Sequence, residues 1–354
     1  MAHALRLAER GLYTTDPNPR VGCIISRNGA VVGAGWHSRA GGPHAEVEAL
    51  RQAGEAARGA TVYVTLEPCS HHGRTPPCAD ALIQAGVARV VAAMQDPNPR
   101  VAGAGLARLQ AAGIATACGL LEEQALRLNR GFVKRMQTGR PWVTGKLAMS
   151  LDGRTALSNG DSRWITGAEA RRDAHRLRAQ SSAIVTGIGT LLADDPAMTA
   201  RLEDEEVLQP LRVVLDSRLR TPVTARLAHP PGHALIICGH EDAARRQALE
   251  QAGFSVLCLP LGDDGRLDLA AVLDALGRRD INEVMLEAGP TLNGAWLQAA
   301  LVDEWVVYMA PCLLGDTARG LFSLPALGGM DERYHLRWLD VRQVGADLRL
   351  KFQF

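Results

Sequence analysis

The chain has 354 residues, enough for two domains of ordinary size, and its 47% hydrophobic and 22% charged residues are typical of a soluble globular protein. Seven cysteines in a chain of this length exclude a disulfide-rich secreted scaffold and favour a reducing, cytoplasmic environment. No run of about 18 apolar residues occurs and the first ten residues lack a signal-peptide core, so we expect no membrane partner and no secretion signal.

The charge is unevenly divided along the chain. Residues 1–140 hold 16 Lys+Arg and 10 Asp+Glu, a net +6, whereas residues 141–354 carry −5. A basic first part favours a phosphorylated substrate, although solvated surface charge would give the same balance. Basic residues form no dense tract and aromatic residues make up only 4%, so we expect no nucleic-acid partner.

The first elements predict a helix and a hairpin. Met1–Arg10 has the spacing of a short amphipathic helix. Gly22–Ser26 and Ala30–Trp36 are apolar, strand-like runs, and Asn28-Gly29 between them is a strong signal for a two-residue hairpin turn.

A hexapeptide occurs twice in this part of the chain, at Asp16–Val21 and at Asp96–Val101. Segments that combine Asp or Asn with Pro are ordinary turn formers. Because the six residues are identical, we expect both loops to border one pocket.

Helices and strands then alternate as far as residue 112. The expected elements are a helix over Ala45–Ala53 with Val47 and Leu50 on one face, a strand over Thr61–Leu66, a helix over Cys78–Ala85, a strand over Arg89–Met94 and a helix over Gly105–Ala112. This order predicts a three-layer α/β domain with a mixed sheet.

His44, Cys69 and Cys78 form a candidate metal site. One nitrogen and two sulfurs suit Zn²⁺, and three protein ligands leave a fourth position for water, as in catalytic zinc sites. A His-x-Glu motif followed by Pro-Cys is typical of zinc-dependent base deaminases, although their two cysteines are usually separated by two residues and here by eight. Glu46 is not needed as a ligand and is placed to transfer protons.

The second part of the chain predicts another α/β domain. A helical stretch over Leu120–Met136 ends at Thr138–Pro141, where we place a boundary between domains 1–140 and 141–354. The expected strands are Trp142–Ala148, Ala183–Gly187, Leu211–Leu215, Ala234–Cys238, Ser255–Leu259, Glu283–Leu286, Trp305–Ala310 and Leu348–Phe354, with helices over Ala168–Ala179 and Ala243–Ala252. We expect the last two strands to form an edge or a dimer seam.

Glu287–Ala295 follows a strand and is predicted to be a glycine loop, with a helix continuing at Trp296. A strand, a glycine turn and a helix start can present backbone N–H groups to phosphate. As an isolated pattern, a plain turn is the better explanation.

Several stretches together resemble one known family, the bifunctional deaminase–reductases of riboflavin biosynthesis. These stretches are Thr15–Gly22, His44–Val47, Thr65–Cys78, Gln95–Val101, Lys146–Ala148, Ser150–Arg154, Arg176–Ser181, Leu192–Pro196, Leu215–Ser217 and Glu287–Leu292. In this family the cysteine spacing seen here is the expected one. The resemblance implies an N-terminal cytidine-deaminase-like domain and a C-terminal dihydrofolate-reductase-like domain.

The resemblance also implies the chemistry. A zinc-dependent domain would remove the 2-amino group of 2,5-diamino-6-(ribosylamino)-4(3H)-pyrimidinone 5′-phosphate, and an NADPH-dependent domain would reduce the ribosyl chain to give 5-amino-6-(5-phosphoribitylamino)uracil. It further implies a homodimer that acts on a small phosphorylated pyrimidine.

Family positions imply roles for individual residues. In the first domain His44, Cys69 and Cys78 would hold zinc, Glu46 would be catalytic, and the substrate pocket would include Asn18, His37, His71, Arg74, Asp96 and Asn98. In the second domain NADPH would contact Ala148, Trp164, Thr190, Asp194, Ser217, Gly289, Pro290, Thr291, Leu292, Asn293, Gly294 and Ala295, and substrate would contact Ser162, Arg178, Met198, Arg201 and Glu287.

Two other functions remain open. A nucleic-acid deaminase with an unrelated second domain would share the zinc site but would need basic and aromatic surface. A non-enzymatic, zinc-stabilised binding module would need no open metal position. The remaining cysteines, which belong to no motif, are expected to be buried packing residues: Cys23, Cys118, Cys238, Cys258 and Cys312.

Overall fold

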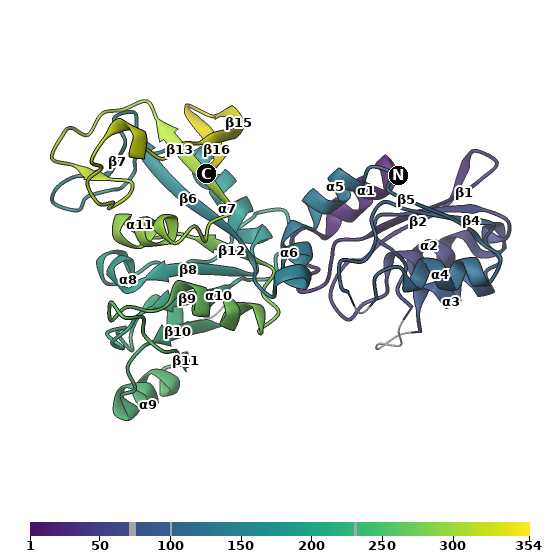
Figure 1. The fold of residues 1–354 in the computed structure, drawn as a ribbon, viewed down its shortest axis with the longest axis horizontal. Helices are drawn as coiled ribbons and strands as arrows, with labels where there is room; N and C mark the ends of the chain where they lie inside the picture. The colour runs from purple at the N-terminus through teal and green to yellow at the C-terminus, as the bar shows by residue number, and fades with distance from the viewer. Residues whose placement is uncertain (71–75, 100, 230–231) are drawn as a thin grey trace. The chain divides into compact units, whose positions relative to one another are not determined.

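The structure is a computed structural model that describes residues 1–70, 76–99, 101–229 and 232–354. The chain forms two compact units, Met1–Arg140 and Pro141–Phe354 (Figure 1). Helix α6 (Arg130–Thr138) ends at Gly139, whose positive φ of 76° terminates it just before the second unit begins. In the described ranges, no helix combines the length and apolarity needed to cross a membrane.

The N-terminal unit is built on a five-stranded mixed sheet in the order β2-β1-β3-β4-β5. Its strands are β1 (Gly22–Arg27), β2 (Ala30–Trp36), β3 (Thr61–Val64), β4 (Arg89–Ala92) and β5 (Ala115–Cys118), and its other helices are α1 (Ala2–Ala8), α2 (Ala45–Ala53), α3 (Cys78–Gln84), α4 (Ala104–Ala111) and α5 (Glu122–Leu128). β1 runs antiparallel to β2 and β3, and β3, β4 and β5 are mutually parallel.

Helices cover both faces of this sheet, as expected for a three-layer domain. α2, α3 and α4 share one apolar core with β1, β3 and β4. α1 and α5 contribute Leu5 and Ala125 to a separate cluster with Leu66 and Met94. The hairpin turn is confirmed, since Asn28 and Gly29 both have positive φ, at 51° and 81°. Edge strand β5 was not predicted, because Ala-Thr-Ala-Cys carries no strong apolar pattern.

Helix α2 lies unusually close to the hairpin. A Cβ atom added to Gly33 would lie 2.2 Å from the carbonyl oxygen of Ala49, and one added to Gly35 would lie 2.4 Å from that of Ala45. The face of α2 that packs on the hairpin glycines therefore consists of Ala45, Ala49 and Ala53, whereas Val47 and Leu50 are only partly buried. Leu50 packs at the margin of the apolar core, and the alanines make the close approach to the hairpin, because the glycine surface admits only small side chains.

The C-terminal unit is built on a nine-stranded sheet in the order β11-β10-β9-β8-β12-β6-β13-β16-β15. Its strands are β6 (Trp142–Ser150), β8 (Ala183–Gly187), β9 (Leu211–Leu215), β10 (Ala234–Cys238), β11 (Ser255–Cys258), β12 (Glu283–Leu286), β13 (Glu304–Ala310), β15 (Arg337–Val344) and β16 (Asp347–Gln353), and the short pair β7 (Arg154–Ala156) and β14 (Arg319–Gly320) stands apart. Its helices are α7 (Ala168–Gln180), α8 (Ile188–Asp194), α9 (Ala243–Gln251), α10 (Leu269–Gly277) and α11 (Pro290–Gln298).

Alternate residues of the central strands point to opposite faces of the sheet and belong to two separate hydrophobic cores. Val185, Leu215 and Leu286 belong to the larger core with α10 and α11. Their neighbours Ile184 and Val214 belong to the second, with α8 and α9 on the opposite face. Helices α8 and α10 were not predicted from the sequence.

Part of the expected glycine loop is a helix, so that prediction was wrong. Helix α11 begins at Pro290, with Gly289 as its N-cap. Proline is favourable at the first helical position, because an N–H group there would have no acceptor within the helix and its absence costs nothing. Gly294 is buried inside this helix, where an added Cβ would lie 2.1 Å from the carbonyl oxygen of Ser323. The glycine therefore allows close packing and does not mark a turn.

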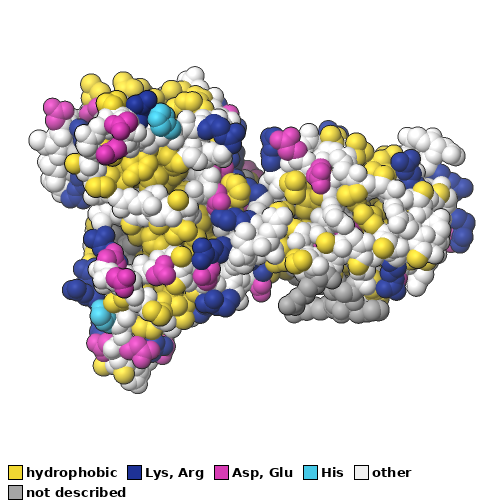
Figure 2. Space-filling view, in the orientation of Figure 1, with side chains coloured by type: hydrophobic (Ala, Val, Ile, Leu, Met, Phe, Trp, Pro, Cys, Tyr) yellow, Lys and Arg dark blue, Asp and Glu magenta, His cyan; other side chains and the backbone are white. Residues whose placement is uncertain are grey.

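β15 and β16 form an antiparallel hairpin, and β15, which was not predicted, is the outer strand. The expectation that Trp305–Ala310 and Leu348–Phe354 form an edge was therefore wrong, because β15 pairs with the outer side of β16. Buried Asp173 on α7 ties α7 to this end of the sheet, since it accepts hydrogen bonds from the Tyr308 hydroxyl at 2.7 Å and from Arg349 Nη1 at 3.0 Å. The outer strand is exposed along most of its length, with Trp338 56% and Val341 54% exposed. Figure 2 shows further apolar side chains exposed between charges of both signs on this unit.

Candidate functional site

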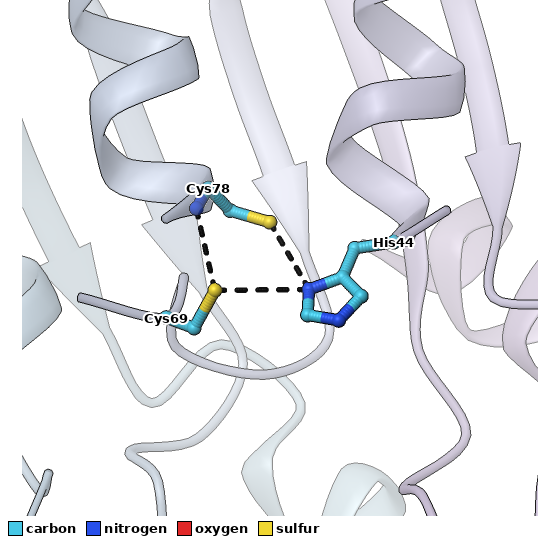
Figure 3. A group of neighbouring side chains, drawn as sticks. All are labelled: His44, Cys69 and Cys78. Carbon is cyan, nitrogen blue, oxygen red and sulfur yellow. Dashed lines mark hydrogen bonds between the residues drawn. The ribbon is translucent and has the colours of Figure 1, made fainter. Parts of the chain in front are cut away.

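His44, Cys69 and Cys78 converge on one point in the N-terminal unit (Figure 3). His44 is the N-cap of α2, Cys78 is the first residue of α3, and Cys69 lies in the segment after β3. His44 Nδ1 lies 3.2 Å from Cys78 Sγ and 3.7 Å from Cys69 Sγ. All three candidate ligand atoms lie within 4.8 Å of one another.

The backbone holds the two cysteines in place. The Cys78 N–H donates to Cys69 Sγ at 3.3 Å, and the Ala79 N–H donates to the Cys69 carbonyl at 3.1 Å. Hydrogen bonding from Cys78 is the main influence that lowers the pKa of the Cys69 thiol, to about 4, while the same contact and burial raise the pKa of Cys78. Two soft sulfurs and an imidazole nitrogen that already converge make a donor set that fits Zn²⁺.

Glu46 lies in the first turn of α2 and is only 3% exposed. Burial raises the pKa of its carboxyl to about 7, against a smaller opposing effect of His44. The group lies beside the cluster, because it interacts electrostatically with His44, Cys69 and Cys78, but it is not one of the three converging ligands. A carboxyl group poised near neutrality beside a metal site can both accept and donate a proton.

Asn18 and His37, two of the expected substrate residues, lie next to this cluster. Asn18 Nδ2 lies 3.0 Å from His37 Nε2, and His37 Nδ1 lies 2.9 Å from the Pro43 carbonyl oxygen. Burial lowers the pKa of His37, which favours a neutral ring that donates to Pro43 and accepts from Asn18. The His37 and His44 rings meet edge to face at 5.5 Å.

Glu67 is a residue that the sequence analysis missed. Its buried carboxylate accepts four backbone hydrogen bonds, from Asp96, Gly103, Gly105 and Leu106, at 2.8–3.2 Å. It therefore ties the second copy of the hexapeptide to the strand end that leads to Cys69. Glu67 directly precedes Pro68-Cys69 in the sequence, and this position beside a candidate metal ligand could have identified it as part of the site.

The remaining expected deaminase residues fall in two groups. Asp96 and Asn98 form a local turn, with the Asn98 N–H donating to Asp96 Oδ1 at 2.9 Å. His71 and Arg74 lie outside the described residues. The expectation that both hexapeptide loops border one pocket therefore stays a prediction, although contacts to His37 and to Glu67 lead from the two loops toward the metal cluster.

In the C-terminal unit the expected cofactor residues gather where parallel strands end. Ala148 lies near the end of β6, Thr190 follows β8, Ser217 follows β9, and Gly289 follows β12. The strands are in register, with Leu286 opposite both Val185 and Gly145, so these ends lie at one edge of the sheet. That edge is the usual ligand site of open α/β sheets.

Two close approaches show that the segments after β8 and β12 are neighbours at this edge. A Cβ added to Gly289 would lie 3.8 Å from Thr190 Oγ1, and one added to Gly187 would lie 3.1 Å from Leu292 Cδ2. Along α11, Thr291 is exposed and Pro290, Leu292 and Ala295 are half-buried, whereas Asn293 and Gly294 are buried in the protein. The buried Asn293 side chain donates to the Ala288 carbonyl at 2.8 Å, which stabilises the start of the helix.

The loop that carries Ser162 and Trp164 reaches the end of α8. Arg163 Nη2 donates to the Asp194 carbonyl at 3.3 Å, which places this loop beside another expected cofactor residue. Trp164 is 71% exposed, and the Arg171 guanidinium lies 4.6 Å from its ring centroid. Ser162 is half-buried.

Arg178 and Glu287 form an ion pair joined by two hydrogen bonds, at 2.5 and 2.7 Å. Thr199 links Arg178 to Arg201, because its carbonyl accepts from Arg178 Nη1 at 3.2 Å and its hydroxyl accepts from Arg201 Nη1 at 3.0 Å. Met198, beside Thr199, is only 2% exposed and packs in the core, so its backbone is what can face a ligand.

Two basic residues near this pair were missed. Burial lowers the pKa of Lys146, which lies within electrostatic range of Glu287 and Arg178. Both ring nitrogens of His175 face Arg201, at 3.3 Å from its backbone nitrogen and 3.0 Å from Nη2. Burial and the two arginines lower the pKa of His175 to about 4. Arg178 and Lys146 both lie within electrostatic range of Glu287, and Thr199 connects Arg201 to Arg178, so positive charge exceeds negative charge here, which favours an anionic ligand.

Family models match both units. Residues 1–94 match the cytidine and deoxycytidylate deaminase zinc-binding region, and residues 141–350 match the RibD C-terminal domain. The chain is 53% identical over 361 residues to the riboflavin biosynthesis protein RibD of Escherichia coli, covering 99% of this chain and 97% of the relative. It is 46% identical to RibD of Haemophilus influenzae, with 99% and 96% coverage.

Solved structures agree. Acinetobacter baumannii RibD superposes with a TM-score of 0.93 at 46% identity, covering 99% of this chain and 96% of that one. A Thermotoga maritima diaminohydroxyphosphoribosylaminopyrimidine deaminase/5-amino-6-(5-phosphoribosylamino)uracil reductase superposes with a TM-score of 0.88 at 31% identity, with 100% and 97% coverage. These matches confirm the resemblance, the α/β fold class of both units and the assignment as an enzyme. The chain belongs to the RibD family of bifunctional deaminase–reductases of riboflavin biosynthesis.

Proposed function

We propose that His44, Cys69 and Cys78 hold Zn²⁺ and that the N-terminal unit removes the 2-amino group of 2,5-diamino-6-(ribosylamino)-4(3H)-pyrimidinone 5′-phosphate. The observation that carries this proposal is the convergence of two sulfurs and one imidazole nitrogen within 4.8 Å, next to a buried carboxyl group outside the ligand set. When bound, zinc would supply Lewis-acid activation of water at neutral pH.

Glu46 is the proton carrier of this site. Its carboxyl group takes the first proton of water and delivers it to a ring nitrogen of the pyrimidine. It then takes the second proton from the hydroxyl group added at C2 and gives it to the departing amino group, which leaves as ammonia. Asn18 and His37 shape the adjoining wall, because both ring nitrogens of His37 are occupied and its ring is fixed against His44. Asp96 and Asn98 belong to the same pocket, held through Glu67.

NADPH is the cofactor that we propose for the C-terminal unit. It would lie along the strand ends, where Ala148, Thr190, Ser217 and the start of α11 meet, with Trp164 and Asp194 at one side. The N-terminus of α11, which begins after Gly289, can direct the backbone N–H groups of its first turn toward a phosphate. When bound, the nicotinamide would supply the hydride, so the protein must orient it and exclude water.

The reductase substrate binds at the neighbouring group of cations. Arg201, which is exposed, pairs with the substrate phosphate, while Arg178 is held by Glu287 and shapes the pocket beside it. Ser162 and the Met198 backbone line the same pocket. Lys146 is the residue placed to give the proton that accompanies the hydride, because its ammonium group is buried beside Glu287 and burial lowers its pKa.

A homodimer, formed through the outer face of β15, is the assembly that we propose. A long edge strand with exposed apolar residues is a ready surface for a second chain. Trp338, Leu339 and Val341 are 56%, 41% and 54% exposed on this strand. We also propose a cytoplasmic location, where the two zinc-binding cysteines stay reduced.

A coupled assay tests this function. Zinc-loaded protein is mixed with the diaminopyrimidinone ribotide and NADPH, and ammonia and NADPH are followed together. Ammonia release followed by an equimolar loss of NADPH is the expected result. Ammonia without NADPH consumption would refute the reductase assignment alone, and no ammonia from zinc-loaded protein would refute the deaminase assignment.

A further inference from the structure

Cys238 and Cys258 lie directly opposite each other on adjacent strands. β10 and β11 are parallel, with Cys238 paired to Cys258 in the register, and the two sulfurs lie 2.7 Å apart. Paired residues on neighbouring strands present their side chains on the same face, with strands about 4.8 Å apart. That spacing lies within the Cα separation of about 4.4–6.8 Å that a disulfide accepts.

The surroundings of this pair make it a thiol site rather than a metal site. Within the described residues, the one group of three or more potential ligands that converge is His44, Cys69 and Cys78. Cys238 is fully buried in the apolar core that includes Ile236 and Leu249. Cys258 is partly exposed and lies on β11, the outermost strand at this end of the sheet.

We propose that Cys238 and Cys258 form a redox-active dithiol, a modification site that closes to a disulfide between β10 and β11 when a peroxide oxidises it. The accessible Cys258 sulfur attacks one peroxide oxygen, so that an S–O bond forms, the O–O bond breaks and one water leaves. The Cys238 sulfur then attacks the resulting sulfenic sulfur, so that the S–S bond forms and the second water leaves with the Cys238 proton.

The order of attack follows from exposure. Burial and the neighbouring Cys258 raise the pKa of Cys238 to about 12, so Cys238 is the poorer first nucleophile and the natural resolving thiol. In total two thiols lose two electrons and hydrogen peroxide is reduced to two waters. A dithiol reductant reverses the reaction by thiol–disulfide exchange.

The pair also lies next to the proposed cofactor edge. The residues after Cys238, Gly239 and His240, both donate backbone hydrogen bonds to the Ser217 carbonyl at 3.1 Å. The Cys238 carbonyl in turn accepts from Leu259 at 2.8 Å, so a bridge at this point restrains the turn that positions Ser217. This second step rests on the proposed function, because it takes Ser217 as an NADPH contact.

Peptide mapping tests the modification site without reference to activity. Zinc-loaded full-length protein is treated with hydrogen peroxide, its remaining thiols are alkylated, and it is digested with trypsin. The sequence places the two cysteines alone in separate tryptic peptides, 227–245 and 247–266. We expect these peptides to be joined in oxidised wild type, separated by dithiothreitol, and never joined in Cys258→Ser.

Cys118→Ser is the matched control, because Cys118 is an exposed cysteine at the end of β5 and its loss leaves the expected bridge intact. Alkylation of both Cys238 and Cys258 after peroxide treatment, or their oxidation to separate sulfinic acids, would overturn the proposal. In the same samples we expect NADPH affinity to change about fivefold on oxidation of wild type and to be unchanged in Cys258→Ser.

The outcomes separate the two claims. A bridge without a change in NADPH affinity would overturn the link to Ser217 and leave the dithiol site established. Failure of the reduced protein to bind NADPH would count against the proposed cofactor, whereas the peptide map would still decide the dithiol.

Discussion

Arg178 and Glu287 join helix α7 to the end of strand β12 through two hydrogen bonds, Nε to Oε1 at 2.5 Å and Nη2 to Oε2 at 2.7 Å. Both side chains are less than one-fifth exposed, at 17% and 16%. Burial by itself would raise the pKa of Glu287, but Arg178 and Lys146 outweigh it and lower the pKa to about 2. The carboxylate therefore stays charged throughout the neutral range and fixes Arg178 beside the proposed substrate.

This pair predicts how stability depends on pH. Because the pKa of Glu287 is lower in the folded protein than its ordinary value of 4.5, the ionised carboxylate stabilises the fold at any pH above about 4.5. That stabilisation is lost as the pH falls from 4.5 toward about 2. The shift corresponds to roughly 3 kcal/mol. Urea unfolding followed by tryptophan fluorescence should show that Glu287→Gln is less stable than wild type at pH 7 and that the difference shrinks in acid. The exposed-site variant Glu203→Gln is the control, and a difference independent of pH would contradict the prediction.

Glu46→Gln should abolish deamination while leaving zinc bound. Loss of the proton carrier is expected to slow ammonia release by about two to four orders of magnitude. Because Glu46 is not a member of the converging ligand set, the metal content should stay at the wild-type level. Reductase activity on supplied deaminated intermediate should persist.

Glu48→Gln, two residues along the same helix and on its more exposed side, is the matched control and should deaminate normally. Metal analysis and an ammonia assay measure both quantities. Rapid ammonia release by Glu46→Gln would show that another group moves the proton.

Glu67→Gln should destabilise the N-terminal unit and weaken the deaminase. The carboxylate accepts from four backbone N–H groups, and an amide in its place would turn its NH₂ toward some of them. The expected loss is on the order of 3 kcal/mol, since charge-assisted hydrogen bonds are the strong ones. Thermal unfolding measures it against Glu55→Gln, an exposed acid of the same unit. Equal stability of the two variants would remove Glu67 from its structural role.

His175→Ala should raise the KM for the phosphorylated reductase substrate several-fold and change kcat little. His175 touches Arg201 at two points and acts as a positioning residue for it. Arg201→Ala should have a larger effect, and the double variant should resemble Arg201→Ala, because both changes act through one guanidinium. Steady-state kinetics of wild type, the two single variants and the double variant test this prediction. Additive effects on KM would show that His175 does not act through Arg201.

Trp338→Lys on β15 should convert the proposed dimer to a monomer. A lysine on an exposed edge strand opposes pairing with a second chain and buries poorly in an apolar interface. Val31→Lys is the control, because Val31 is 53% exposed on edge strand β2 of the other unit. Sedimentation analysis of both variants gives the answer, and a Trp338→Lys dimer as tight as wild type would place the interface elsewhere.

Much of the fold could be read from local patterns. Apolar runs such as Ala183–Gly187 and Ala234–Cys238 coincide with β8 and β10, and Asn28-Gly29 gave the hairpin. Elements with weak or ambiguous patterns were missed: β5 consists of small residues, and β15 carries exposed apolar residues with no burial period. The Gly289–Ala295 segment was wrongly predicted to be a loop, because a glycine can occur where two segments pack closely as well as in a turn.

By itself the sequence determined the family and predicted the chemistry proposed for the two sites, because metal ligands, a proton carrier and anion-binding arginines depend on residue type and can be recognised as motifs in the linear sequence. Only the tertiary structure decided what supports that chemistry. Glu67 reaches backbone groups up to 39 residues away, His175 meets Arg201 across 26 positions, and Cys238 meets Cys258 through the register of two strands. Such contacts depend on how strands pair and helices pack, and no local pattern encodes the distance between residues that folding brings together.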